Sequence, residues 1–242
     1  KLNFYKKKYK KIEKNLNFIK ENNIIYISDN IGYLYAYNFN KDKIVWAKNY
    51  KIPFNSNLKI YENKIIAANI NNNLLILEKN TGDMLKKIPT EETIVQNTFT
   101  NNLSQNKNST LFLNSYGSLY TIEKKLNINW FLNLNPAKEL IPSNLFSGNQ
   151  IVTYKNLIVV PANNSTYILN SSSGSIIHKV NFSSSLKPII LDEYLLMISK
   201  NNLLILFDII NAEIIYSYNI NEKIANFLNT KPKNVQFKSL SI

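Results

Sequence analysis

The sequence predicts an all-β fold assembled from repeated units, and three observations support this prediction. From Asn22 onward, short apolar runs rich in Ile, Leu, Val and Tyr alternate with Asn, Asp, Ser or Lys, as strands alternate with turns. No long segment keeps a helical period, so few helices are expected. One short pattern recurs along most of the chain and closes on a large residue at positions 46, 86, 130, 178 and 216.

The recurring pattern is clearest in "YAYNFNKDKIVW", residues 35–46. A small or apolar residue comes first, with a polar residue two positions on, turn residues five and six positions on, and a large residue ten positions on. The residues that fit are Ala36, Asn38, Lys41, Asp42 and Trp46; Ile76, Glu78, Thr81, Gly82 and Lys86; Ile168, Asn170, Ser173, Gly174 and His178; and Leu206, Asp208, Asn211, Ala212 and Tyr216. A further copy, "YTIEKKLNINW", is one residue short between Glu123 and Trp130.

Each copy follows the same lead-in of an apolar strand, a polar pair and a second strand, as in "IIYISDNIGYLYAYN". Intervals of roughly 40 residues match one four-stranded blade of a β-propeller. One such sheet cannot bury both of its faces alone, so neighbouring sheets must stack, with Trp46 as a packing wedge between them. Gly82 and Gly174 tolerate a positive φ at the end of the turn, whereas Asp42 and Ala212 predict a strained or differently shaped turn.

These repeats divide the chain into a lead-in and a series of blades. We expect a basic lead-in or outer strand at residues 1–21 and a β-propeller at residues 22–242. The expected blades are residues 22–57, 58–100, 101–148, 149–187 and 188–222, with the start of a further blade at 223–242.

Composition narrows the class of partner. The formal net charge is +13 over 242 residues, and every basic residue is Lys. Nucleic-acid binders more often use Arg, whose planar fork pairs with guanine and phosphate, so no nucleic-acid partner is expected. The abundance of Lys, Asn, Ile and Tyr is typical of an AT-rich genome. The Lys-rich start, residues 1–20, is either a tether to an anionic membrane surface or, as we favour, an outer strand or solvated lead-in.

Residue types that are absent or rare exclude several kinds of site. The chain has no Cys, which excludes disulfides, zinc–thiolate clusters and thiol nucleophiles, and it has no run of 18 apolar residues. His178 is the single histidine and occupies the Trp position of its repeat, so we interpret it as a packing residue, with a catalytic or pH-sensing role as the alternative. "NSSSGS", residues 170–175, lacks the Lys-Ser/Thr ending of a phosphate loop and is interpreted as a turn.

Two long polar connections are candidates for recognition. They are residues 90–110, "TEETIVQNTFTNNLSQNKNST", and residues 133–148, "NLNPAKELIPSNLFSG". Loops carried on a rigid scaffold often bind partners, although these two could equally well only span from one blade to the next. The sequence names no individual partner-contacting residue.

The repeat resembles the signature of PQQ-like β-propellers, Ala-x-Asp-x-x-Thr-Gly-x-x-x-Trp. "ILEKNTGDMLK" and "AYNFNKDKIVW" are degenerate copies of it, and the resemblance covers residues 22–220. It implies a ring of seven or eight blades, of which this chain would hold five and part of a sixth. One branch of this family comprises quinoprotein dehydrogenases with a calcium-bound quinone in the central channel. The other comprises non-catalytic scaffolds, notably the BamB-type proteins that assist outer-membrane β-barrel assembly.

The chain fits the dehydrogenase branch poorly. Only Trp46 and Trp130 close a repeat with Trp, a vicinal disulfide is impossible without Cys, and no convergent set of carboxylates for calcium is recognisable. We therefore expect no enzyme, no cofactor, and no catalytic, cofactor-binding or metal residue. Resemblance to the BamB type implies the periplasm, at the inner face of the outer membrane, with the barrel-assembly machinery or unfolded barrel proteins as partners and peripheral membrane association as an option. The alternatives are a PQQ-dependent dehydrogenase-like enzyme and a generic PQQ-like interaction or sensor protein.

Overall fold

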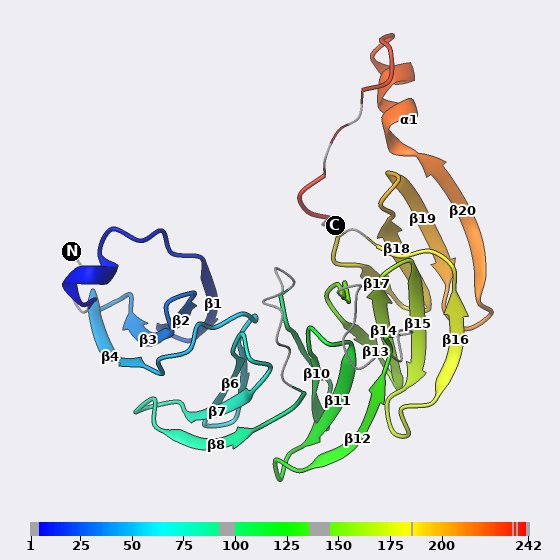
Figure 1. The fold of residues 1–242 in the computed structure, drawn as a ribbon. Helices are drawn as coiled ribbons and strands as arrows, with labels where there is room; N and C mark the ends of the chain where they lie inside the picture. The colour runs from blue at the N-terminus through cyan, green and yellow to red at the C-terminus, as the bar shows by residue number, and fades with distance from the viewer. Residues whose placement is uncertain are drawn as a thin grey trace. The chain divides into compact units, whose positions relative to one another are not determined.

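The computed structural model describes residues 5–91, 100–135, 146–184, 186–233, 235 and 237–240, and within them lie five antiparallel sheets of four strands each (Figure 1). In every sheet the strands follow one another in chain order, so that the first and fourth strands are the edges. The all-β fold of four-stranded blades predicted from the repeats is therefore confirmed.

The blades have similar bounds along the chain. The first contains β1 (Leu16–Glu21), β2 (Ile24–Asp29), β3 (Tyr33–Asn38) and β4 (Lys43–Asn49). The second contains β5 (Lys59–Tyr61), β6 (Lys64–Ala68), β7 (Leu74–Glu78) and β8 (Met84–Ile88). The third contains β9 (Asn102–Gln105), β10 (Ser109–Leu113), β11 (Ser118–Glu123) and β12 (Ile128–Asn133).

The last two blades complete the set. The fourth contains β13 (Val152–Tyr154), β14 (Leu157–Ala162), β15 (Ser165–Asn170) and β16 (Ile176–Val180). The fifth contains β17 (Ile189–Leu191), β18 (Tyr194–Ile198), β19 (Leu203–Asp208) and β20 (Glu213–Asn219). Helices are few, as predicted: a 3-10 helix at Lys7–Tyr9 and α1 (Ile220–Phe227) are those among the described residues.

The structure differs from the sequence-based ranges at both ends. The first blade begins at Leu16, inside the segment expected to be a lead-in or outer strand, because Leu16–Glu21 pairs with β2 along its whole length. At the other end, residues 220–227 form α1 where a further blade was expected to start. The side chain of Asn219 begins this helix by accepting a hydrogen bond from the backbone N–H of Asn221. Residues 228–233, 235 and 237–240 contain no strand.

Backbone contacts divide the chain into two compact units. The first comprises Lys1–Leu103 with Asn114–Tyr116, and the second comprises Ser104–Leu113 with Gly117–Ile242. The first two blades lie in the first unit, β10 to β20 lie in the second, and β9 runs across the division.

The repeat predicted from sequence corresponds to one structural position in every blade. The pairing between the third and fourth strands shifts register at this position, at Ala36/Tyr37, Ile76/Leu77, Thr121/Ile122, Ile168/Leu169 and Leu206/Phe207. The residue before each shift pairs with the large closing residue: Ala36 with Trp46, Ile76 with Lys86, Thr121 with Trp130, Ile168 with His178 and Leu206 with Tyr216. The shortened third copy thus keeps this pairing, and its missing residue falls in the turn.

The polar residue of the repeat caps the turn between the third and fourth strands. The side-chain oxygen of Asn38 accepts hydrogen bonds from the backbone N–H groups of Asn40 (3.1 Å) and Lys41 (2.9 Å). Asn170 and Asp208 make the same two bonds in the fourth and fifth blades. For Asp208 these bonds, led by those from Asn211, lower the pKa of the carboxyl group. In the second blade the longer side chain of Glu78 takes this role and accepts from the Thr81 N–H (2.7 Å).

The turn also requires a left-handed backbone at its end. The φ values there are +71° at Gly82 and +73° at Gly174, but +46° at Asp42 and +59° at Ala212. Asp42 and Ala212 therefore hold a conformation that disfavours residues with a Cβ, as the sequence predicted.

Each tryptophan docks on the glycine turn of the following blade. The indole nitrogen of Trp46 donates to the carbonyl oxygen of Lys79 (3.0 Å), and a Cβ added at Gly82 would lie 2.6 Å from the indole ring. Trp130 donates to the carbonyl oxygen of Ser171 (3.1 Å), and a Cβ at Gly174 would again lie 2.6 Å from the ring. Trp and Gly therefore work as a pair across successive repeats.

The cores lie between the sheets within each unit. In the first unit, Leu34 and Ala36 from the first blade pack with Ile65 and Leu77 from the second, and Trp46 lies against this cluster. In the second unit, one cluster joins the third and fourth blades and contacts Trp130, and another joins the fourth and fifth blades. The prediction that Trp46 is a wedge between blades is thus confirmed.

Part of the lead-in packs on the first blade. The Tyr5 hydroxyl donates to Asp29 (2.7 Å), and its ring lies edge-on to that of Tyr33 with centroids 4.9 Å apart. Burial, together with the neighbouring Asp29 carboxylate, raises the pKa of Tyr5. Lys7 and Lys8 are exposed, as expected of a solvated lead-in, and the membrane tether stays the untested alternative.

We expect Gly174→Ala to lower the free energy of unfolding by about 1–3 kcal/mol, because the new methyl group would meet the Trp130 ring. Ala212→Gly is the matched control in the same unit, and it should leave stability unchanged or raise it because a positive φ costs an L-residue about 1–2 kcal/mol. Urea unfolding of both variants is the measurement. Equal destabilisation by the two changes would contradict the docking account.

We expect the stability of the first unit to fall above about pH 10 in part through Tyr26. Burial, followed by the charges of Glu21 and Glu78, raises the pKa of this phenol to about 12. Its unfolded pKa is about 10, so its contribution is complete below that pH and is lost as the pH rises through 12. Tyr26→Phe should therefore flatten the decline of unfolding free energy between about pH 10 and 12, and a decline as steep as that of the wild type would contradict this account.

Candidate functional site

The structure places the sequence-derived candidates in ordinary blade positions. His178 is half-buried on β16 opposite Ile168, at the position that Trp46 holds in the first blade. Residues 170–175 form the turn between β15 and β16, as predicted, since Asn170 caps this turn. Over the described ranges, no three His, Asp or Glu side chains are grouped so that they could hold a metal ion. Among the same residues, no helix has the length and apolar character to cross a membrane.

The two candidate recognition loops are only partly described. Residues 92–99 and 136–145 lie outside the described residues. The first loop was expected to be a polar connection at residues 90–110, yet it contains β9 and the start of β10. One residue of β9 is held from outside its sheet: the Leu103 N–H donates to Asn57 Oδ1 (2.8 Å), and the Asn57 side-chain amide donates to the Leu103 carbonyl (2.7 Å).

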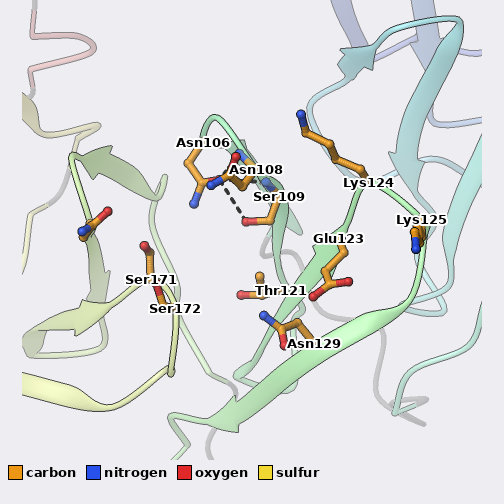
Figure 2. Close-up of a pocket in the computed structure, with 11 residues that line it drawn as sticks. Asn106, Asn108, Ser109, Thr121, Glu123, Lys124, Lys125, Asn129, Ser171 and Ser172 are labelled. Atoms are coloured by element: carbon orange, nitrogen blue, oxygen red, sulfur yellow. Dashed lines mark hydrogen bonds between the residues drawn. The ribbon is translucent and has the colours of Figure 1, made fainter.

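A polar cavity of about 500 Å³ lies in the second unit, where turns of the third and fourth blades meet (Figure 2). Amide, hydroxyl and charged side chains line it: Asn106, Asn108, Ser109, Thr121, Glu123, Lys124, Lys125, Asn129, Asn156, Ser171 and Ser172. Asn106 is held in place because its side-chain oxygen accepts bonds from the backbone N–H groups of Asn108 (2.9 Å) and Ser109 (2.8 Å) and from the Ser109 hydroxyl (3.0 Å).

The polar cavity exists because the fourth blade has a short side chain at a repeat position where the second blade has a long one. Trp46 donates to the carbonyl of Lys79 and Trp130 to the carbonyl of Ser171, so Lys79 and Ser171 are equivalent. In the first unit the Lys79 ammonium reaches across to Glu21 Oε2 (2.7 Å) and the Glu62 carbonyl (2.8 Å). Ser171 cannot span that distance, and the space is left open.

A buried hydroxyl without a partner faces the polar cavity. Thr121 is 1% exposed, and its Oγ1 atom has no hydrogen-bond partner in the structure. Figure 2 shows Thr121 between the Ser171–Ser172 turn and Glu123. The equivalent residue of the first blade is Ala36, which has no polar atom to satisfy. A buried hydroxyl without a partner costs free energy.

An apolar groove of about 510 Å³ lies at the end of the fifth blade. Aliphatic and aromatic side chains dominate its lining, which consists of Ile198, Leu204, Tyr218, Ile220, Lys223, Ile224, Phe227, Leu228 and Leu240. Phe227 is 86% exposed, although it belongs to the amphipathic helix α1. This groove continues the exposed apolar surface of β20.

The fourth strand of every blade exposes large apolar side chains. They are Val45 on β4, Met84 and Leu85 on β8, Ile128 and Phe131 on β12, Ile176 and Ile177 on β16, and Ile214, Ile215, Tyr216 and Tyr218 on β20. Lys86 and Lys87 interrupt this surface on β8, whereas β20, of sequence EIIYSYN, carries no Lys. Since β20 also ends its sheet, it combines an open hydrogen-bonding edge with an apolar surface.

Sequence reasoning missed the polar cavity, the apolar groove and the outer strands as candidate sites. The signal for the polar cavity was present in the repeat, since Ser171 follows the turn-capping residue where Lys79 stands in the second blade. The apolar groove depends on α1, which the sequence did not predict.

Comparison with known proteins identifies the fold. No family model and no curated protein matches the sequence. The crystal structure of BamB from Moraxella catarrhalis is similar with a TM-score of 0.72 at 12% identity, over 85% of this chain and 64% of that one. The computationally designed Ika8 protein is similar with a TM-score of 0.66 at 10% identity, over 93% of this chain and 65% of that one.

A third similar structure is the quinohemoprotein alcohol dehydrogenase from Comamonas testosteroni, with a TM-score of 0.66 at 14% identity, over 84% of this chain and 42% of that one. This chain thus spans less than two thirds of the length of each of the three. At these identities the likeness concerns the fold alone, and it supports the PQQ-like β-propeller fold expected from the repeat.

We expect Thr121→Val to raise the free energy of unfolding by about 1–3 kcal/mol, because valine keeps the shape of threonine and removes the hydroxyl that lacks a partner. Thr166→Val is the matched control. Thr166 is also buried on a third strand of the second unit, but its hydroxyl donates to the Phe182 carbonyl (2.8 Å), so this variant should lose about 1 kcal/mol. Thermal unfolding of dialysed protein is the measurement, and a loss of stability in both variants would show that Thr121 has a partner.

Proposed function

We propose that this chain is a non-catalytic β-propeller scaffold that binds protein partners, and that it acts as a BamB-like component in the assembly and insertion of outer-membrane β-barrel proteins. Under this proposal the protein acts in the periplasm, at the inner face of the outer membrane. The fold likeness to BamB supports the proposal, as do the repeats that resemble those of PQQ-like propellers.

The observation that carries the proposal is the character of β20. Six of its seven residues are exposed, and among them Ile214, Ile215, Tyr216 and Tyr218 are large and apolar. The rings of Tyr216 and Tyr218 stack with centroids 5.9 Å apart, which gives the strand a continuous aromatic surface. Natural proteins normally protect such an edge with Lys, Pro or a covering segment, and an edge without protection favours pairing with another strand.

The mechanism that fits this strand is strand addition. An extended segment of a partner would lie along β20 and exchange main-chain hydrogen bonds with its open edge. Main-chain bonds supply affinity without depending on the partner's sequence, and the exposed apolar side chains select segments with alternating apolar residues. Strands of an outer-membrane barrel, before insertion, have this alternating pattern.

We expect a fluorescently labelled peptide with the alternating sequence of a barrel strand to bind the purified chain, and Ile214→Lys to weaken this binding at least tenfold. A charge on the strand opposes apolar contact and edge pairing. Leu85→Lys, at an equally exposed residue on β8, is the matched control and should change the Kd less than twofold. Fluorescence anisotropy measures both.

The same variants should behave alike with purified barrel-assembly machinery from a Gram-negative outer membrane. Absence of binding to both the peptide and the machinery would refute the proposal. An enzyme would instead give a stoichiometric visible-range absorbance after incubation with quinone and calcium, which a scaffold should not show.

A further inference from the structure

We propose that the polar cavity is a binding site for a neutral, hydroxyl-rich small molecule of the mono- or disaccharide class. It lies within the second unit, away from the outer strand β20, and it does not depend on the protein-binding function proposed above.

The polar cavity lies where the first unit has a filled seam, the line along which two successive blades meet. Two successive blades meet at the same kind of seam in both units, fixed by a tryptophan that donates to a carbonyl in the next turn. In the first unit the seam is closed by Lys79, which is bonded to Glu21 and to the Glu62 carbonyl. In the second unit the equivalent residues are Ser171 and Asn106, which are too short and carry no charge, and a cavity of about 500 Å³ remains.

One residue that lines the polar cavity, Thr121, has a side-chain hydroxyl without a hydrogen-bond partner. The hydroxyl of Thr121 is buried and has no partner, although most buried polar groups in folded proteins have one. A ligand hydroxyl that displaces the atoms now covering Oγ1 would satisfy it, since hydroxyl groups both donate and accept. The third strand of the first blade has Ala36 at this position, so a hydroxyl is not required by the repeat.

The described lining of the polar cavity is mostly polar and uncharged. Eight of the eleven lining residues are Asn, Ser or Thr, whose side chains offer donors and acceptors without charge. The remaining three are Glu123, Lys124 and Lys125, so an ionic ligand would meet both signs of charge. None of the described lining residues is aliphatic or aromatic, so apolar contact comes only from side-chain stems such as those of Lys124 and Lys125. Neutral molecules with many hydroxyl groups match such a lining, and the volume suits one or two sugar rings.

The test uses maltose and N-acetylglucosamine as probes with the complete 242-residue chain. Saturation-transfer NMR and calorimetry should show saturable binding, with a Kd on the order of 1 mM for a site not matched to one particular sugar. Ser171→Lys copies the residue that fills the seam in the first unit and should weaken binding at least tenfold. Asn106→Glu combined with Ser171→Lys gives the new ammonium group a carboxylate partner, as Glu21 is the partner of Lys79.

Two further variants locate the binding. Thr121→Val removes the hydroxyl that lacks a partner and should weaken binding at least fivefold. Ser173→Lys makes the same substitution as Ser171→Lys in the same turn but outside the polar cavity, and it should change the Kd less than twofold.

Several outcomes would overturn the inference. They are absence of saturable binding by either sugar, binding that persists in the filled variant, and a crystal structure of the sugar-soaked protein with only water at Thr121. Loss of peptide binding in Ser171→Lys, without any sugar binding, would assign the polar cavity to a protein partner instead. The peptide experiment with Ile214→Lys tests only the protein-binding proposal, and the sugar experiments test only the polar cavity. Failure of one proposal is therefore distinguishable from failure of the other.

Discussion

One contact occurs at both the joint of the first and second blades and that of the third and fourth, an indole ring packed against a glycine turn. The sheet of a single blade has two apolar faces and cannot bury both, so stability comes from stacking one sheet on the next. Trp46 and Trp130 fix that stacking because each ring packs where a Cβ is absent and each indole N–H donates to a main-chain carbonyl. The ring supplies apolar contact and the hydrogen bond supplies a defined orientation. The clusters of Leu, Ile and Val between the sheets then pack within a geometry that this contact has set.

Local chemistry made the blades predictable from the sequence. Asn38, Asn170 and Asp208 cap the same turn in three blades. Each stands at the same distance in sequence from the large closing residue, and this constant spacing identified the repeat. Asn also takes left-handed positions in other turns, among them Asn22, Asn72 and Asn202, which explains how an all-β chain with only five Gly makes so many turns. Strands, turns and blade positions follow from interactions within about ten residues, and such interactions are visible in a sequence.

Features that join distant residues were less predictable. In the sequence, Trp46 stands in one repeat and Gly82 in the next. Only the structure shows that the Trp46 ring packs against Gly82. For residues 1–21 the Lys-rich sequence left a lead-in and an outer strand open, and only the structure shows Leu16–Glu21 paired with β2. The helix α1 begins at the hydrogen-bonded cap Asn219, after a strand rich in β-formers. The polar cavity is a difference between two seams, so it appears only when Ser171 and Lys79 are compared in space.

The indole hydrogen bonds end on main-chain carbonyl oxygens, and this has a consequence for how such a chain can change over time. A carbonyl is present whatever the residue, so the joint between two blades does not constrain the side chain at the acceptor position. Lys79 and Ser171 show this directly, since one bears an ammonium group and the other a small hydroxyl while the joint stays the same. Mutation at that position can therefore create or fill a cavity between two blades, or change its charge, without breaking the indole hydrogen bond. A duplicated blade can thus acquire different side chains while it keeps its place in the stack.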